Sequence, residues 1–226
     1  MRSIVTGANR GIGLALTREL LIRGYEVHVG VRKVGAESLS SLKKEYPQSF
    51  HVHRLDVSDP RSIENFTSEI GELGIDLLIN NAGVLHRDGL GNLDYEKFLY
   101  TLKVNTMGPM FLSNALVENI VKNRGKIVNI DSLMGSISLH STTRSYSYSV
   151  SKAALNMVTR LLATDLKEKG VIVVSIHPGW VRTDMGGSEA PLKPEDSARS
   201  ILNVVEKLTI TDSGKFFDRT GRELSW

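Results

Sequence analysis

Hydrophobic residues follow two alternating patterns along the chain. Short continuous apolar runs are separated by longer stretches in which apolar residues recur every three or four positions, as at Ile63, Phe66 and Ile70. The first pattern is typical of strands buried on both faces, and the second of amphipathic helices. The runs predict a first strand that ends at Ile4 and Val5, and six more strands at residues 26–31, 50–55, 76–79, 126–130, 171–176 and 215–218.

Helices are predicted between these strands. Gly24, Pro47 and Gly170 end three of them, and Ser58 is expected to cap another. The predicted helices start at the glycines of residues 11–13 and, further along, cover residues 39–46, 58–73, 94–122, 147–169 and 194–208. This alternation in 226 residues predicts an α/β fold with one doubly wound Rossmann-type domain, residues 1–226. We expect a parallel sheet of about seven strands with helices on both faces.

The turn after the first strand is the first candidate site. In doubly wound sheets, ligands bind beyond the carboxyl ends of the strands. Residues 6–13 read Thr-Gly-Ala-Asn-Arg-Gly-Ile-Gly and lead into a predicted helix. A glycine turn before a helix directs backbone N–H groups and the positive end of the helix dipole at a phosphate. The spacing differs from G-x-G-x-x-G, and a turn without a ligand is the alternative.

Two arginines indicate which dinucleotide would bind. Arg32 ends the second predicted strand, where a carboxylate usually meets a free ribose 2′-hydroxyl, and Arg10 lies in the glycine turn. Two guanidinium groups there favour a 2′-phosphate, and therefore NADP(H) over NAD(H). The alternative is a pair of solvated surface arginines. Asp56, after the third strand, either accepts a hydrogen bond from the adenine amino group or belongs to the next helix cap with Ser58 and Asp59.

Tyr148 and Lys152 are the candidate acid–base pair. They are four residues apart in a predicted helix, so they share a face. A phenol has a pKa near 10, and an ammonium group about 4 Å away favours the phenolate by about 4 kcal/mol, or roughly three pK units. A Tyr-x-x-x-Lys pair alone is weak evidence, but Ser132 follows the fifth strand and strengthens it. Ser136 and Ser138 are rival serines; Ser132 is preferred because it directly follows the strand.

Composition excludes several classes of function. The chain has no cysteine, which excludes disulfides, thiolate metal sites and cysteine nucleophiles, and no metal site is predicted. The net charge is +3 without a basic run, so no nucleic-acid or membrane partner is expected. No apolar run has transmembrane length, and the first strand leaves no room for a leader. We therefore expect a cytoplasmic protein.

The combined motifs resemble the classical short-chain dehydrogenase/reductase family over essentially the whole length. Gly179–Gly187 and Gly214–Asp218 further resemble its C-factor and carbonyl-reductase-like branch. The matching elements are Thr6–Gly13, Asn80–Gly83, Val104-Asn105, Ile130–Ser132, Tyr148–Lys152 and Pro178–Thr183.

The resemblance implies specific residue roles. Tyr148 would be the general acid/base, Lys152 would lower its pKa and hold the nicotinamide ribose, and Ser132 would bind the substrate carbonyl. Asn105 would break the long helix and position a water in a proton relay. The turn at Asn80–Gly83 would be mostly structural and lie under the cofactor. The implied cofactor-binding residues are Thr6, Gly7, Asn9, Arg10, Gly11, Ile12, Gly13, Arg32, Asp56, Val57, Asn81, Ala82, Gly83, Tyr148, Lys152, Pro178, Gly179, Val181 and Thr183.

The leading hypothesis is an NADP(H)-dependent oxidoreductase that reduces a small-molecule ketone or aldehyde reversibly. An NADP(H)-binding regulator without turnover is the alternative, and an epimerase or dehydratase is a third. Ser132 and Tyr148 are 16 apart (148 − 132), longer than is usual for the family, so residues 136–144 must bulge near the substrate. Substrate specificity is expected from residues 85–93, 133–144 and 184–192. A homodimer or homotetramer through the helices of Asn105 and Tyr148 is implied by the resemblance.

Overall fold

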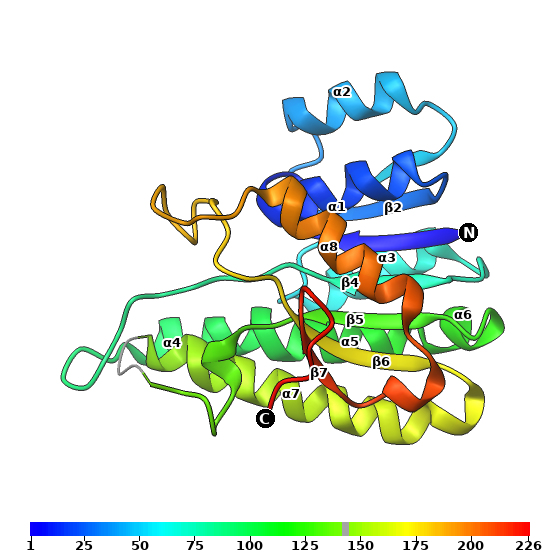
Figure 1. Ribbon diagram of the computed structural model, residues 1–226. Helices are drawn as coiled ribbons and strands as arrows, with labels where there is room; N and C mark the ends of the chain where they lie inside the picture. Colours follow the sequence, from blue (N-terminus) through cyan, green and yellow to red (C-terminus); the bar gives the residue numbers. More distant parts are fainter. Residues whose placement is uncertain (142–144) are drawn as a thin grey trace.

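A parallel sheet forms the centre of the protein (Figure 1), and the computed structural model describes residues 1–141 and 145–226. Within these residues, seven strands pair in the order β3-β2-β1-β4-β5-β6-β7, and each named pair is parallel. The strands are β1 Arg2–Thr6, β2 Glu26–Val31, β3 Phe50–Arg54, β4 Leu77–Asn80, β5 Lys126–Ile130, β6 Ile172–His177 and β7 Phe216–Asp218. The predicted doubly wound fold is therefore confirmed, with strand ends that differ by about a residue.

Helices cover both faces of the sheet. They are α1 Gly11–Ile22, α2 Glu37–Glu45, α3 Pro60–Ile70, α4 Tyr95–Leu102, α5 Gly108–Ala115, α6 Val117–Lys122, α7 Tyr146–Leu166 and α8 Pro194–Lys207. A π-helical turn at Lys103–Met107 joins α4 to α5, so the long predicted helix is interrupted at Asn105, as expected. In the described part of the chain, no helix is long and apolar enough to cross a membrane.

Two apolar clusters lie on opposite faces of the sheet. One packs α1, α2 and α8 against residues such as Val5, and the other packs α3, α5, α6 and α7 against residues such as Ile4. Neighbouring residues of a strand point to opposite faces, so the continuous apolar run of β1 supplies both clusters. Figure 1 shows the two helical layers on either side of the sheet.

The start of α3 differs from the prediction. Asp59, not Ser58, caps this helix, and its Oδ1 accepts a hydrogen bond from the Arg61 amide at 3.0 Å. Ser58 is already engaged, because its amide and hydroxyl both donate to Oδ1 of Asp56, at 3.0 and 2.6 Å. The helix also ends at Ile70 rather than at residue 73, because Gly71 has a φ of +57°.

Candidate active site

A cavity of about 890 Å³ lies at the carboxyl ends of the strands. It collects predicted site residues from loops that are far apart in the sequence. Sixteen of these predicted residues line it: Gly7, Asn9, Arg10, Gly11, Ile12, Gly13, Arg32, Asp56, Val57, Asn81, Ala82, Gly83, Tyr148, Lys152, Pro178 and Thr183. Five other predicted residues are not among those that line it: Thr6, Asn105, Ser132, Gly179 and Val181.

The glycine turn is packed against its own backbone. Gly7 and Gly11 have φ values of +68° and +54°, which side chains rarely adopt. A Cβ on Gly13 would collide with the Gly7 carbonyl oxygen and the Asn81 side-chain amide. The structure thus gives an internal reason for Gly13: a side chain there is excluded by the turn itself, not only by an approaching pyrophosphate.

Thr6 and Asn81 join the glycine turn to the turn that follows β4. The Thr6 hydroxyl accepts hydrogen bonds from the amides of Asn81 and Ala82, at 3.0 and 2.9 Å. The Asn81 side-chain amide donates to the Thr6 carbonyl at 2.9 Å. Thr6 is buried, so it supports the cavity from behind.

The two predicted phosphate-binding arginines both reach the cavity. Arg10 forms an exposed ion pair with Asp184, and the Arg32 guanidinium donates to the Tyr100 hydroxyl at 3.1 Å. Asp56 also lines the cavity while accepting the two bonds from Ser58. Both interpretations of Asp56 therefore remain compatible with its position.

Tyr148 and Lys152 are buried together on α7, with 8% and 5% of their surfaces exposed. The Lys152 ammonium lies 5.8 Å from the centroid of the Tyr148 ring and donates to the Ile130 carbonyl at 2.6 Å. Burial, and next the charge of Asp131, raise the pKa of Tyr148, while the nearby Ser132 hydroxyl acts in the other direction. The expected lowering of the Tyr148 pKa by Lys152 stays a prediction, because in this structure burial outweighs the groups that would lower this pKa.

Asp131 is a site residue to which sequence reasoning assigned no role. It lines the cavity, is only 2% exposed, and accepts a hydrogen bond from the Ser132 amide at 2.6 Å. Burial raises its pKa to about 7, although the charge of Lys152, the hydrogen bond from the Ser132 amide and the nearby Ser175 hydroxyl oppose the rise. Burial also lowers the pKa of Lys152, and Asp131 opposes that change. The sequence signal that could have identified Asp131 as a site residue is its place directly after an apolar strand.

Asn105 is a buried scaffold residue with both ends of its amide engaged. Its Oδ1 accepts from the Val84 amide at 2.8 Å, and its Nδ2 donates to the Val84 carbonyl at 2.8 Å and to the Ser151 hydroxyl at 3.0 Å. These bonds tie the loop after β4 to α7. The contacts fix the wall of the cavity next to Gly83, and the predicted contact with a relay water stays a prediction.

The rival serines face away from this pair. Ser136 and Ser138 donate to the carbonyl oxygens of Ser225 and Trp226, at 2.8 and 2.7 Å. Ser132 is the serine whose hydroxyl acts to lower the pKa of Tyr148. The predicted bulge at residues 136–144 falls in part on residues 142–144, which lie outside the described residues.

The remaining predicted residues follow β6. Pro178 lines the cavity, and Gly179 has a φ of +85°, which turns the chain toward Val181. Val181 is buried and pairs with Leu192 in an isolated bridge. Thr183 lines the cavity opposite the glycine turn, where its methyl group lies close to Gly11.

Comparisons with known proteins agree with this architecture. A family model described as short chain dehydrogenase matches residues 2–193. C-signal from Myxococcus xanthus is 40% identical over 154 residues, which cover 67% of this chain and 93% of C-signal. The crystal structure of NADPH-bound carbonyl reductase from chicken fatty liver superposes with a TM-score of 0.93 and 34% identity, covering 100% of this chain and 98% of that one. Carbonyl reductase Sniffer of D. melanogaster superposes with a TM-score of 0.94 and 31% sequence identity, and the match covers 100% of this chain and 99% of that one.

Proposed function

The chain belongs to the short-chain dehydrogenase family of oxidoreductases, and from this premise we propose that it reduces a ketone or aldehyde with NADPH. The observation that carries the proposal is the cavity itself. Tyr148 and Lys152 share its wall with the glycine turn and with both Arg10 and Arg32. The proposed acid–base pair, the proposed phosphate-binding turn and two cations thereby line one cavity, as hydride transfer from a phosphorylated dinucleotide would require.

The residues present fit NADP(H). The first turn of α1 carries no acidic side chain, so its N-terminus favours an anion. Arg10 and Arg32 would hold the 2′-phosphate, and Asp56 and Val57 would lie at the adenine. The nicotinamide side would be held by Asn81, Ala82, Gly83, Lys152, Pro178, Gly179, Val181 and Thr183. The NADPH bound to the chicken carbonyl reductase supports this assignment.

Tyr148 supplies the proton in this proposal. When bound, the cofactor supplies the hydride, which adds to the carbonyl carbon of the substrate. The raised pKa of Tyr148 keeps its phenol protonated at neutral pH, which is the form that can give a proton to the developing alkoxide. The Ser132 hydroxyl orients the carbonyl oxygen, and Lys152 stabilises the phenolate that is left behind.

A screen of small ketones and aldehydes with NADPH tests the proposal by loss of NADPH absorbance. At least one carbonyl compound should be turned over by the wild type and not by Tyr148→Phe. Tight NADPH binding without turnover of any compound would instead favour the second candidate, an NADP(H)-binding regulator. The relative called C-signal is the observation that favours this second candidate.

We also propose that the protein forms a homodimer through the helical segments that contain Asn105 and Tyr148. Exposed apolar side chains lie along the π-helical turn, α5 and α7: Met107, Phe111, Val150, Met157 and Leu161. Clustered exposed apolar groups mark protein interfaces more often than scattered ones do. Sedimentation velocity at several concentrations would detect the dimer, and a monomer throughout would contradict it.

A further inference from the structure

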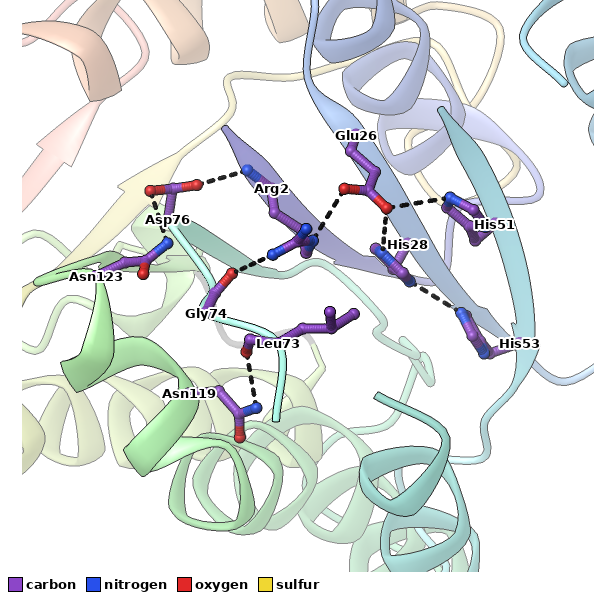
Figure 2. A network of polar contacts seen from close by, with 10 residues as sticks. All are labelled: Arg2, Glu26, His28, His51, His53, Leu73, Gly74, Asp76, Asn119 and Asn123. Atoms are coloured by element: carbon purple, nitrogen blue, oxygen red, sulfur yellow. Dashed lines mark hydrogen bonds and ion pairs between the residues drawn. The ribbon is translucent and has the colours of Figure 1, made fainter. Parts of the chain in front are cut away.

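A second cluster of ionisable side chains begins at the amino ends of β1 and β2 and extends along β3 (Figure 2). Glu26 and His28 are two residues apart on β2, and His51 and His53 are two apart on β3. His28 is paired with His51 in the strand register. Because residues two apart in a strand share a face, all four side chains lie on one face of the sheet. The active-site cavity is at the opposite ends of the strands.

Three potential ligand atoms converge in this cluster. Oε1 of Glu26 lies 3.4 Å from Nε2 of His28 and 3.3 Å from Nε2 of His51. The two imidazole rings stack with their centroids 4.5 Å apart. All three ligand atoms lie within 4.8 Å of one another. Figure 2 shows both rings directed at the same carboxylate oxygen.

These contacts are at ion-pair distance, as the dashed lines in Figure 2 mark, but they do not have hydrogen-bond geometry. Both Nε2 atoms are buried, and across residues 1–141 and 145–226 neither has a hydrogen-bond partner. A buried polar atom without a partner is costly, and such atoms in native proteins call for an explanation such as an ion.

The neighbouring contacts determine where the proton of His28 lies. Glu69 Oε2 lies 2.7 Å from Nδ1 of His53, so this nitrogen carries the hydrogen that the carboxylate accepts. In a neutral His53 ring, Nε2 then accepts, and Nδ1 of His28, 3.1 Å away, donates to it. Nε2 of His28 therefore presents a lone pair to the carboxylate of Glu26.

Two electron-pair donors facing each other at this distance are suited to a cation between them. Zn²⁺ binds imidazole nitrogen and carboxylate oxygen at about 2.0–2.2 Å, which places the ligands of a tetrahedral site about 3.4 Å apart. The two separations between Glu26 and the histidines, 3.3 and 3.4 Å, match this value, and the two stacked rings would tilt toward each other on binding so that both nitrogens face the ion. We propose that Glu26, His28 and His51 bind one divalent transition-metal ion, best Zn²⁺, with water as the fourth ligand.

The surroundings support this site. Arg2 donates from Nε to Oε2 of Glu26 at 3.0 Å, which orients the carboxylate and leaves Oε1 for the metal. The chain from His28 through His53 to Glu69 is a carboxylate–histidine arrangement of the kind that holds metal-binding imidazoles in place. The side chains of Glu26 and His51 are 35% and 33% exposed, so the ion can enter from solvent. The metal would join β2 to β3, the edge strand of the sheet.

Calorimetric titration of the tag-free protein with Zn²⁺ tests the site, with Co²⁺ absorption reporting tetrahedral coordination. The wild type should bind one equivalent. His51→Ala should weaken binding by at least about 100-fold, beyond the usual effect of an outer partner. Glu69→Ala changes an exposed side chain that does not touch the ion, so this variant should fold normally. Because Glu69 orients His53, and His53 orients His28, the variant should bind Zn²⁺ about 10–100-fold more weakly.

His140→Ala is the matched control, because it removes an exposed histidine outside the cluster. It should bind Zn²⁺ like the wild type. The site is refuted if the wild type binds no stoichiometric Zn²⁺, or if His51→Ala and Glu69→Ala both bind as tightly as His140→Ala. None of these readouts depends on NADPH or on turnover, so the fate of the proposed reductase activity does not affect them.

Discussion

The two ends of the sheet each place a carboxylate beside cationic or basic groups, yet the two carboxylates respond in opposite ways. Burial acts to raise the pKa of Glu26, but Arg2 and the nearby histidines outweigh it and lower this pKa. Asp131 at the other end is almost completely buried, and its pKa rises to about 7 although Lys152 is close. A charged partner therefore does not fix the protonation state by itself. The degree of desolvation decides whether the partner or the burial prevails.

Gly13→Val should have the largest effect at the carboxyl end. The added side chain would overlap the Gly7 carbonyl oxygen, so the turn must open, and NADPH binding should be lost together with part of the stability. Gly35→Val is the matched control, because a Cβ there meets nothing within 4 Å. Thermal melts and NADPH titration measure both quantities. Unchanged NADPH affinity in folded Gly13→Val would show that the turn accommodates a side chain at this position and that its close packing is not needed to bind the cofactor.

Asp131→Asn tests whether burial controls the carboxyl-end group. Since the folded pKa of about 7 lies above that of an exposed carboxyl, the folded state binds more protons than the unfolded state between about pH 4 and 7. The contribution of Asp131 to stability is thus fully present below about pH 4 and is lost as the pH rises through 7. Asparagine does not titrate, so the variant should gain up to about 4 kcal/mol relative to the wild type over that window, from three units at 1.36 kcal/mol each.

Urea unfolding at a series of pH values measures this difference. Subtracting the wild-type curve removes the contributions of other groups, including His177, whose pKa is lowered to about 4 chiefly by burial. Asp165→Asn removes an exposed carboxyl on α7 and controls for a change of charge alone. Parallel curves for Asp131→Asn and the wild type would mean that Asp131 is ionised in the folded protein.

The difference between the ends also explains what the sequence could predict. The glycine turn and the Tyr148–Lys152 pair are local patterns, because their geometry depends on residues a few positions apart. The Glu26–His28–His51 cluster depends on the register of β2 with β3, which brings together residues more than 20 positions apart. The same limit applies to energies: the sequence places Tyr148 next to Lys152, but the pKa of Tyr148 depends on burial by the whole fold. Asp59 replaces Ser58 as the α3 cap because Asp56 engages Ser58. This competition is local, between residues two positions apart, and several neighbouring side chains were able to act as the cap.

Tyr148→Phe should reduce turnover by roughly 100-fold or more, the usual scale for loss of a positioned acid or base. NADPH affinity should stay almost unchanged, because Lys152 is retained. Tyr146→Phe is the control: Tyr146 is the first residue of α7, and among the described residues Tyr148, not Tyr146, lines the cavity. If Tyr146→Phe lost turnover while Tyr148→Phe kept it, the catalytic assignment would be wrong.

Arg32→Asp should have the smallest effect, because the arginine is exposed and its present contact is a single hydrogen bond to Tyr100. NADP(H) should bind more tightly than NAD(H) to the wild type, since a hydrogen bond to a charged group contributes about 1.5–3 kcal/mol. In the variant, the ratio of the affinity for NADP(H) to that for NAD(H) should fall at least about tenfold, because the cation is lost and an acceptor for a 2′-hydroxyl is gained. Arg54→Asp makes the same change of charge at an exposed position at the end of β3, and it should leave the ratio of the two affinities unchanged. Fluorescence titration with both cofactors gives these ratios. Equal affinities of the wild type for NADPH and NADH would show that Arg10 and Arg32 are solvated surface groups, and the carboxyl end would then select its ligand by the glycine turn alone.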